Sequence, residues 1–329
     1  MNIYDMAREA GVSIATISRV INGKDTVSPK TRSRVEAVLK KYNYAPSEIA
    51  RGLVVNSIRT VGVMTADIRD VYYAHVSYRV EQELSKLGYN VILCNTGEDT
   101  KEKIKYMQTI LQKKVDGIIL VGSVFRDAGL DSYIAEAAER VPVVMINGHA
   151  DSRNVYSVIC DDAFGTASVV DYMVGAGRKA LVYLRDRHSY SSDLKARGFK
   201  AGMKKNGLPF GKYSLIDVKK GLEGGYEGID RLMEKKCVFD AVICGDDLTA
   251  IGAIKALKRQ GIKVPEQVAV TGFDNSVLAR CSDPSLTSVD SMMEEMGRHA
   301  VDIFSRIMEG SKVRNSLVIK PEIIVRDSG

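Results

Sequence analysis

Residues 5–19 read Asp5-Met6-Ala7-Arg8-Glu9-Ala10-Gly11-Val12-Ser13-Ile14-Ala15-Thr16-Ile17-Ser18-Arg19. Apolar residues recur at helical spacing before Gly11 and again after Ser13, so we expect two short helices joined by a tight turn. Gly11 tolerates the backbone conformation that such a turn needs, and Ser13 can cap the second helix. This arrangement is typical of a helix-turn-helix, whose second helix enters the major groove of DNA.

The outward face of the second helix carries no acidic residue. Ile17, Val20 and Ile21 form its apolar stripe, which leaves small, apolar and basic side chains on the other side. A face that meets only solvent usually mixes both signs of charge, so we favour DNA contact over a helical hairpin inside another core. The residues predicted to contact DNA here are Ser13, Ile14, Ala15, Thr16, Ser18 and Arg19, followed by Asn22 in the next turn.

The positive charge of the chain is concentrated near its start. Residues 1–60 hold ten Lys and Arg against five Asp and Glu, which is a net +5 out of +6 for the 329 residues. A module that contacts phosphates requires such an excess. The nearly neutral remainder speaks against a non-specific polyanion binder.

Two further elements are expected before residue 60. Ser28-Pro29 predicts the start of a third helix, since Ser is a capping residue and Pro suits the first helical position. Arg32 lies on this helix as a phosphate candidate. Residues 47–55 predict a helix of about two turns, which is too short to be stable alone in water. On spacing alone, Leu53 is either a wedge between base steps in the minor groove or a packing residue.

From Thr60 onward, short apolar runs alternate with helical patterns. Near-continuous apolar runs are typical of parallel strands covered on both faces, so we expect an α/β fold with two doubly wound lobes. Ligand chemistry is then expected at the carboxyl ends of the strands. The predicted strands are residues 61–64, 90–94, 116–121, 143–146, 158–160, 180–184, 214–218, 241–244 and 268–271, and predicted helices include 74–87, 101–114 and 128–140.

Short polar and acidic residues follow most of these strands, among them Ser123, Asp161, Asp246 and Asp274. Such residues suit hydrogen bonding to a polyhydroxylated or similarly polar small molecule. Capping of the following helix is the alternative at each position, and it is the more common role for Asp and Asn there.

The sequence lacks the signatures of several other classes. The five cysteines form no C-x-x-C pair and are expected to be free thiols in a reducing compartment. No phosphate-binding loop, nucleophile elbow or metal-type His/Cys cluster occurs, so we expect no enzyme activity, cofactor or metal. No signal peptide or membrane-spanning run is present either, which predicts a soluble cytoplasmic protein with no membrane partner.

The chain resembles the LacI/GalR family of bacterial repressors over its whole length. The resemblance is carried by residues 4–13, 16–23, 27–32, 50–53 and 272–275. It implies a homodimer whose two heads read a pseudo-palindromic DNA operator. The implied domains are a helix-turn-helix head over 1–46, a hinge helix or linker over 47–58, and a periplasmic-binding-protein-like domain over 59–329. The first lobe of that domain is expected at about 60–160 and 291–320, and the second at about 161–290 and 321–329.

The resemblance also assigns roles to DNA-contacting residues. Ile14 and Ala15 match the two positions that discriminate between operators, in the manner of the catabolite-control and purine repressor subgroup. Neither side chain can donate a hydrogen bond, so apolar contact with thymine methyl groups is expected. Arg19 matches a base- or phosphate-contacting arginine. Leu53 matches a leucine that opens the central base step, which favours the wedge. The hinge residues assigned to DNA are Ala50, Arg51 and Leu53.

For the ligand, the resemblance implies that Tyr72 and Tyr73 stack on an effector and that Asp274 binds its hydroxyl or amino groups. Lys195 and Lys220 stand where the family has a clamping arginine and a stacking aromatic residue. This change points either to an acidic or phosphorylated effector, or to lysines that only meet solvent. The predicted effector-binding residues are Tyr72, Tyr73, Ser123, Asp161, Phe164, Lys195, Lys220, Asp246 and Asp274.

Together these features predict a transcriptional regulator, of the repressor type, whose operator affinity is set by a small polar effector such as a sugar or sugar derivative. The effector would act by population shift between two arrangements of the lobes. Two alternatives stay open. One is a regulator of the same type that is controlled by a protein partner, and the other is a solute-binding receptor of the same fold without DNA function.

Overall fold

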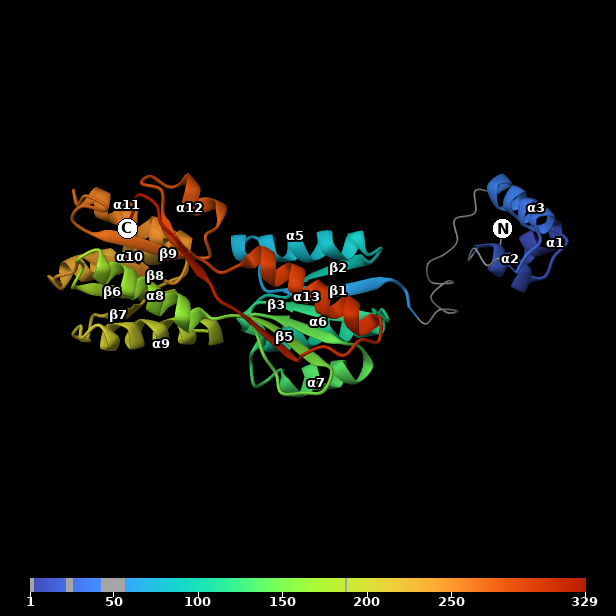
Figure 1. Cartoon of the computed structure of the whole chain (residues 1–329), viewed down its shortest axis with the longest axis horizontal. Coiled ribbons are helices and arrows are strands. Elements are labelled where there is room, and N and C mark those ends of the chain that lie inside the picture. Colours follow the sequence, from blue (N-terminus) through green and yellow to red (C-terminus); the bar gives the residue numbers. More distant parts are fainter. Residues whose placement is uncertain (1–2, 22–25, 43–56, 187) are drawn as a thin grey trace. The chain divides into compact units, whose positions relative to one another are not determined.

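The computed structural model describes residues 3–21, 26–42, 57–186 and 188–329, and the chain divides into two units, Met1–Thr60 and Val61–Gly329 (Figure 1). Each unit has its own buried core. The predicted helix over residues 47–55 lies outside the described residues. So do four of the residues predicted to contact DNA, Asn22, Ala50, Arg51 and Leu53.

The N-terminal unit contains the three predicted helices, α1 (Ile3–Glu9), α2 (Ile14–Ile21) and α3 (Pro29–Lys41). One side chain from each helix, Met6, Ile17 and Val35, is fully buried in a shared core. Apolar residues three or four positions apart lie on one face of a helix, which is why three short helices can close such a core.

The connections between these helices follow from residue chemistry. Gly11 has a φ of +62°, a conformation that costs glycine little and other residues more. The backbone N–H of Thr16 donates to Ser13 Oγ at 3.2 Å and so caps α2. The backbone N–H of Thr31 donates to Ser28 Oγ at 3.3 Å and caps α3 in the same way. The predicted turn and both predicted caps are present.

The C-terminal unit is built on two six-stranded sheets, with orders β11-β5-β4-β3-β1-β2 and β12-β10-β9-β8-β6-β7. The strands of the first sheet are β1 (Thr60–Thr65), β2 (Asn90–Asn95), β3 (Gly117–Val121), β4 (Val143–Ile146), β5 (Val155–Cys160) and β11 (Ser316–Ile319). Those of the second are β6 (Leu181–Arg185), β7 (Leu215–Asp217), β8 (Ala241–Cys244), β9 (Ala269–Phe273), β10 (Thr287–Asp290) and β12 (Glu322–Ile324).

Three strands that the sequence pattern did not predict complete these sheets. β10 pairs parallel with β9, and β11 pairs parallel with β5. β12 runs antiparallel to β10, in contrast to the all-parallel expectation. β11 ends beside Cys160, the last residue of β5, and after two intervening residues β12 begins beside Asp290, the last residue of β10. The chain therefore enters the second sheet from the carboxyl ends of its strands and runs against them.

Helices cover both faces of the first sheet, as the buried runs require. On one face lie α5 (Val71–Lys86) and α13 (Met293–Met308), and on the other lie α6 (Thr100–Gln112) and α7 (Asp131–Arg140). In β1, Val63 belongs to the first cluster and Met64 to the second, so consecutive residues of one strand are both buried. We call this sheet and its four helices the first lobe.

The second sheet is covered in the same way. On one face lie α10 (Leu222–Glu234) and α11 (Asp247–Arg259), and on the other lie α8 (Asp162–Gly175) and α9 (Tyr190–Lys205). A short helix, α12 (Val277–Cys281), follows β9. We call this sheet and its five helices the second lobe.

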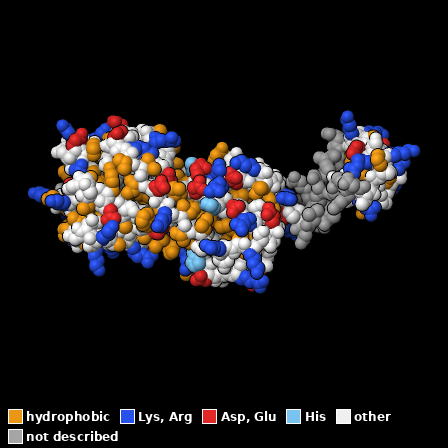
Figure 2. Space-filling view, viewed as in Figure 1, with side chains coloured by type: hydrophobic (Ala, Val, Ile, Leu, Met, Phe, Trp, Pro, Cys, Tyr) orange, Lys and Arg blue, Asp and Glu red, His pale blue; other side chains and the backbone are white. Residues whose placement is uncertain are grey.

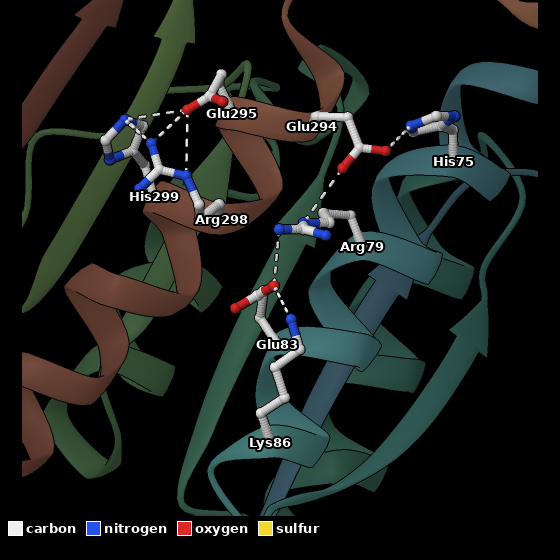
Figure 3. Close-up of polar contacts among 8 residues, drawn as sticks. All are labelled: His75, Arg79, Glu83, Lys86, Glu294, Glu295, Arg298 and His299. Atoms are coloured by element: carbon white, nitrogen blue, oxygen red, sulfur yellow. Dashed lines mark hydrogen bonds and ion pairs between the residues drawn. The ribbon is translucent and has the colours of Figure 1, made fainter.

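In the first lobe, α5 and α13 lie side by side and are joined by ion pairs (Figure 3). Glu294 of α13 contacts His75 Nε2 at 2.7 Å and Arg79 Nε at 3.2 Å, both on α5. Arg79 also contacts Glu83 one turn along the same helix, at 2.8 Å. These pairs fix the edge of a contact whose centre is apolar, with Val76 and Met296 fully buried.

Candidate DNA-contacting face and ligand cavity

The residues predicted to contact DNA from α2 lie on the side of the helix opposite its core. Ser13, Ile14, Ala15 and Arg19 are exposed, and Thr16 and Ser18 are half-buried. Ile14 is 38% exposed although its side chain is large and apolar, whereas Ile17 on the same helix is fully buried. The first turn of α2 has no acidic residue, so the partial positive charge of the helix N-terminus is not neutralised there.

The basic residues of this unit are not equivalent. Arg32 is half-buried on α3, and Lys41 at the end of α3 forms an ion pair of 2.7 Å with Glu9 of α1. The hydrogen bond between these two side chains raises the pKa of Lys41 and lowers that of Glu9. Lys41 therefore joins α3 to α1, while other Lys and Arg side chains are seen on the surface of the unit in Figure 2.

A cavity of about 610 Å³ lies in the C-terminal unit between the two lobes. Its volume is within the range of about 300–1,000 Å³ that is usual for small-molecule sites. Residues at the carboxyl ends of strands from both sheets line it, as expected for doubly wound folds. These are Asp67, Gly122 and Asn147 from the first sheet, and Asp186, Gly245 and Asp274 from the second.

Seven of the nine residues predicted to bind an effector line this cavity: Tyr72, Tyr73, Ser123, Lys195, Lys220, Asp246 and Asp274. Asp161 and Phe164 do not, and this part of the prediction differs from the structure. Asp161 caps α8 by accepting from the Phe164 backbone N–H at 3.0 Å, and the Phe164 ring is 44% exposed near Lys320. Asp161 follows β5 and caps α8. Asp162, the first residue of α8, is the one whose side chain is buried.

Lys195 is buried at the base of the cavity. Gly198 allows α9 to approach α8 closely, since a Cβ atom there would overlap the carbonyl group of Ala163. One turn earlier, Lys195 is 8% exposed, donates from Nζ to the Gly245 carbonyl oxygen at 2.8 Å, and lies 3.6 Å from the centre of the Phe273 ring. Lys195 therefore does not lie in solvent, which was one of the two roles expected for it.

The pKa of Lys195 reflects its surroundings. Burial by itself lowers the pKa, but the carboxylates around it, with Asp274 and Asp162 the strongest, outweigh burial and raise the pKa above its ordinary value. The ammonium group is charged at neutral pH and is held by acidic residues of the protein.

Two carboxyl groups lie near this lysine, with Asp247 buried and Asp274 half-buried. Burial raises the pKa of Asp274 to about 6, even though Lys195 acts to lower it. Burial and the neighbouring Asp274 raise the pKa of Asp247 to about 7. Asp247 accepts from the N–H of Ser276 at 2.7 Å and from the Ser288 hydroxyl at 2.5 Å. Asp247 thus has a clear structural role, whereas Asp274 lies at the carboxyl end of β9 where a ligand can reach it.

The aromatic pair lies at the start of α5. The rings of Tyr72 and Tyr73 meet edge to face, with centres 5.5 Å apart. The Tyr72 hydroxyl is buried and has no hydrogen-bond partner among the described residues. Burial, together with the charges of Asp274 and Asp162, raises the pKa of this hydroxyl, so it is neutral and can donate or accept. The Tyr72 side chain lines the cavity, while its hydroxyl oxygen is itself shielded from solvent.

The two lobes contact each other at the rim of the cavity. Lys220, in the loop after β7, forms an ion pair with Asp70, which caps α5 in the first lobe. The Ser123 hydroxyl lies 3.4 Å from the Ser189 hydroxyl across the same gap. Lys220 thus spans the lobes, a role that neither interpretation of its sequence position included.

Several lining residues were not among the predicted ones. Asp67, Asn147, Asp186 and Asp247 all follow strands, where polar residues were expected, but helix capping was the favoured role for such positions and these four were not assigned to the effector. Glu223 and Asp70 had no such signal, because Glu223 lies in the first turn of α10 and Asp70 precedes α5. Across the described ranges, no group of three or more His, Cys, Asp or Glu residues is arranged to hold a metal ion. No helix of the described chain is long and apolar enough to cross a membrane.

Two known sequence families match the chain. Residues 59–325 match the family described as "Periplasmic binding proteins and sugar binding domain of LacI family", and residues 2–47 match "Bacterial regulatory proteins, lacI family". An HTH-type transcriptional regulator of Lachnoclostridium phytofermentans is 39% identical over 99% of this chain and 98% of its own length. The catabolite control protein A of Priestia megaterium is 30% identical over 98% of this chain and 97% of its own length.

Solved structures agree with this. A transcriptional regulator CelR–cellobiose complex is 26% identical with a TM-score of 0.75, and the match covers 100% of both chains. The lac repressor dimer bound to operator and the anti-inducer ONPF has a TM-score of 0.89 over 100% of this chain and 98% of its own; at 22% identity it shows the fold alone. The relatives are transcriptional regulators, which confirms the prediction of a non-enzyme and excludes the receptor without DNA function.

Proposed function

Since the chain belongs to the LacI family of DNA-binding transcriptional regulators, we propose that it is a homodimeric repressor of a pseudo-palindromic operator, with operator affinity set by a small polar effector in the cavity between the lobes. The observation that carries this proposal is the cavity itself, which is enclosed by residues of both lobes. A ligand that contacts both lobes binds one arrangement of them better than another, and only such a difference can shift an equilibrium.

The DNA-contacting part of the proposal rests on the exposed face of α2. Ile14 and Ala15 would contact thymine methyl groups, and Ser13, Thr16, Ser18 and Arg19 would bind phosphates or base edges. Arg32 would add a phosphate contact from α3. The remaining proposed contacts are Asn22 after α2 and the hinge residues Ala50, Arg51 and Leu53, with Leu53 as the minor-groove wedge.

The names of two relatives bear on what controls the protein. The CelR structure is a cellobiose complex, which supports a sugar or sugar derivative as effector. The name of the other relative, catabolite control protein A, states neither a ligand nor a partner, so control by a protein partner rests on the sequence resemblance alone. The enclosed cavity favours the small molecule.

The experiment begins with selection of bound sequences from a library of random duplexes by the full-length protein. We expect two half-sites related by a dyad, binding that weakens with salt, and a dimer in analytical ultracentrifugation at micromolar concentration. Removal of residues 1–58 should abolish the electrophoretic mobility shift of the selected duplex while leaving ligand binding intact. A monomer, or equal binding to scrambled duplexes, would exclude the proposal. Transcription from a promoter that carries the selected site then distinguishes repression from activation.

A further inference from the structure

The charged residues that line the cavity are mostly acidic. Seven carboxyl side chains line it, against three cationic side chains, among the residues that the structure describes. The acidic residues are Asp67, Asp70, Asp186, Glu223, Asp246, Asp247 and Asp274, and the basic ones are Arg69, Lys195 and Lys220. Asp247, with a pKa of about 7, is only partly ionised at neutral pH, but the other acidic residues still outnumber the cations. A cavity with this balance repels an anion and attracts a cation, and more strongly than a site in open solvent would.

Each of the three cations already has a partner within the protein. Arg69 contacts both oxygens of Asp67, at 2.9 and 2.8 Å. Lys220 is paired with Asp70, and Lys195 with the Gly245 carbonyl and the Phe273 ring. A phosphate or carboxylate on a ligand would have to displace one of these contacts and would then face the remaining acidic residues. Lys195 and Lys220, which replace the family's arginine and aromatic residue, thus bind groups of the protein itself. Their presence is therefore no argument for an acidic or phosphorylated effector.

Asp274 is the acidic residue best placed for a ligand. It is half-buried at the carboxyl end of β9 and lines the cavity. The charged groups that face it are Lys195 from α9, Asp162 from α8, Asp70 from the start of α5 and Asp247 from α11. One cation therefore stands among several carboxyl groups, and a second cation would lower the cost of keeping them ionised.

The second observation is an unpaired hydroxyl near Asp274. The buried hydroxyl of Tyr72 lacks a hydrogen-bond partner among the described residues, and Asp274 is the group whose charge acts on it most. A buried hydroxyl without a partner costs free energy that a ligand hydroxyl or amine can recover. The half-buried Tyr72 ring beside it has an apolar face, which suits the carbon skeleton of a sugar or a cation.

We propose that the effector is a polyhydroxylated molecule that carries a protonated amine, of the amino-sugar class, bound with its ammonium group toward Asp274 and a hydroxyl on Tyr72. This inference rests on the proposed use of the cavity as the effector site. The amine distinguishes the ligand from a neutral sugar of the same skeleton, and the surplus of carboxylates disfavours uronic acids and sugar phosphates.

Titration calorimetry of the full-length protein with matched ligand sets tests the proposal. Each set contains four compounds that share one hexose skeleton. The first set is glucosamine, glucose, N-acetylglucosamine and glucose 6-phosphate. The other two sets are the corresponding compounds of galactose and mannose. We expect at least one free amine to bind ten times more tightly than its neutral and N-acetylated counterparts, with an affinity that falls as salt rises. A neutral or phosphorylated compound that binds as well as the amine overturns the inference, and so does a result in which no free amine binds.

Variants connect the result to the site. Asp274→Asn keeps the shape of the side chain and removes its charge, so the preference for amine over neutral sugar should fall about tenfold, towards parity. Glu223→Gln, on the exposed first turn of α10, is the second variant and is used if Asp274→Asn impairs folding. It should reduce the preference for the amine over the neutral sugar by a smaller factor. A preference unchanged in both variants contradicts the assignment. Duplex binding is measured on the same preparation without ligand, so a failure of DNA recognition and a failure of ligand class are recorded separately.

Discussion

Lys220 Nζ lies 2.5 Å from Asp70 Oδ2, and this ion pair joins the second lobe to the first at the rim of the cavity. Asp70 uses its other oxygen to cap α5, accepting from the Tyr72 backbone N–H at 2.9 Å. The same carboxylate therefore holds the start of the helix that carries both cavity tyrosines and the lysine from across the gap. The Asp70 side chain therefore links the closing of the lobes to the position of the two tyrosines.

Removing this pair should favour the open arrangement of the lobes. The Lys220 side chain is 38% exposed, so the pair contributes at most about 1 kcal/mol, which corresponds to about a fivefold change in the ratio of closed to open forms. We expect Lys220→Ala to lower energy transfer between dyes placed on the two lobes. Lys219→Ala is the matched control, because Lys219 pairs with Glu227 inside the second lobe at 3.7 Å. Equal effects of the two substitutions would rule out the link between the lobes.

Two isoleucines of α2 separate folding from DNA recognition. Ile17 is fully buried, and Ile17→Ala should destabilise the N-terminal unit by about 2–5 kcal/mol and abolish duplex binding through loss of structure. Ile14 is 38% exposed, so Ile14→Ala should change stability by less than about 0.5 kcal/mol and alter the preferred base sequence. Circular dichroism of an isolated N-terminal fragment and selection with the full chain measure the two effects. An unaltered sequence preference in Ile14→Ala would remove that residue from the DNA contacts.

Asp247 should make stability depend on pH. Its folded-state pKa is raised to about 7, from an ordinary value of 3.8, so between these values the folded chain keeps a proton that the unfolded chain has lost. The contribution of this group to stability is therefore complete below about pH 4 and lost as pH rises through 7. Asp247→Asn removes this dependence. Relative to the parent, the variant should gain stability between pH 5 and pH 8, by up to a few kcal/mol at about 1.4 kcal/mol per pKa unit.

Urea unfolding at the two pH values measures this change, and the difference between them cancels any constant cost of altering the hydrogen bonds to Ser276 and Ser288. Glu234→Gln, near the end of α10 in the same lobe, is the control, since its carboxyl group is exposed. If the free energies of unfolding of the variant and the parent differ by the same amount at pH 5 and at pH 8, Asp247 does not titrate between these pH values.

Close packing of α8 against α9 should make Gly198 intolerant of a methyl group. A Cβ atom there meets the backbone of Ala163, which cannot move aside as a flexible side chain would. We expect Gly198→Ala to destabilise the second lobe by about 1–3 kcal/mol and to weaken ligand binding, because Lys195 lies one turn away. Gly175→Ala, at the end of α8 with open space around it, should be neutral or stabilising. Thermal unfolding and calorimetry compare the pair, and similar melting temperatures would contradict the packing argument.

Much of the fold could be predicted from the sequence because burial on both faces leaves a plain signal. β1, β3, β4 and β8 are short apolar runs, and every residue in them is buried. β11 and β12 escaped prediction because they are edge strands with exposed residues among their side chains, so they lack such a run. Their place depends on partners far away in the chain, and a local pattern does not contain that information.

The cavity was predictable to the same extent. The strand-end rule located Ser123, Asp246 and Asp274, but it could not decide between neighbours such as Asp161 and Asp162, where a shift of one residue exchanges a helix cap for a buried group. Nor could it foresee that Lys220 meets Asp70, since 150 positions separate them. The lysines alone therefore do not describe the charge of the cavity, because their partners also determine what a ligand meets.

The late position of α13 and β11 affects how the chain can fold as it is made. α13 covers one face of the first sheet and β11 pairs with β5, yet both are translated after strands β6 to β10 of the second lobe. On the ribosome, the nascent first lobe keeps an open sheet edge and an uncovered apolar surface until residues 293–319 have emerged. During that interval the growing polypeptide is exposed to misassociation, and we expect it to need chaperone protection that an uninterrupted domain of this size would not.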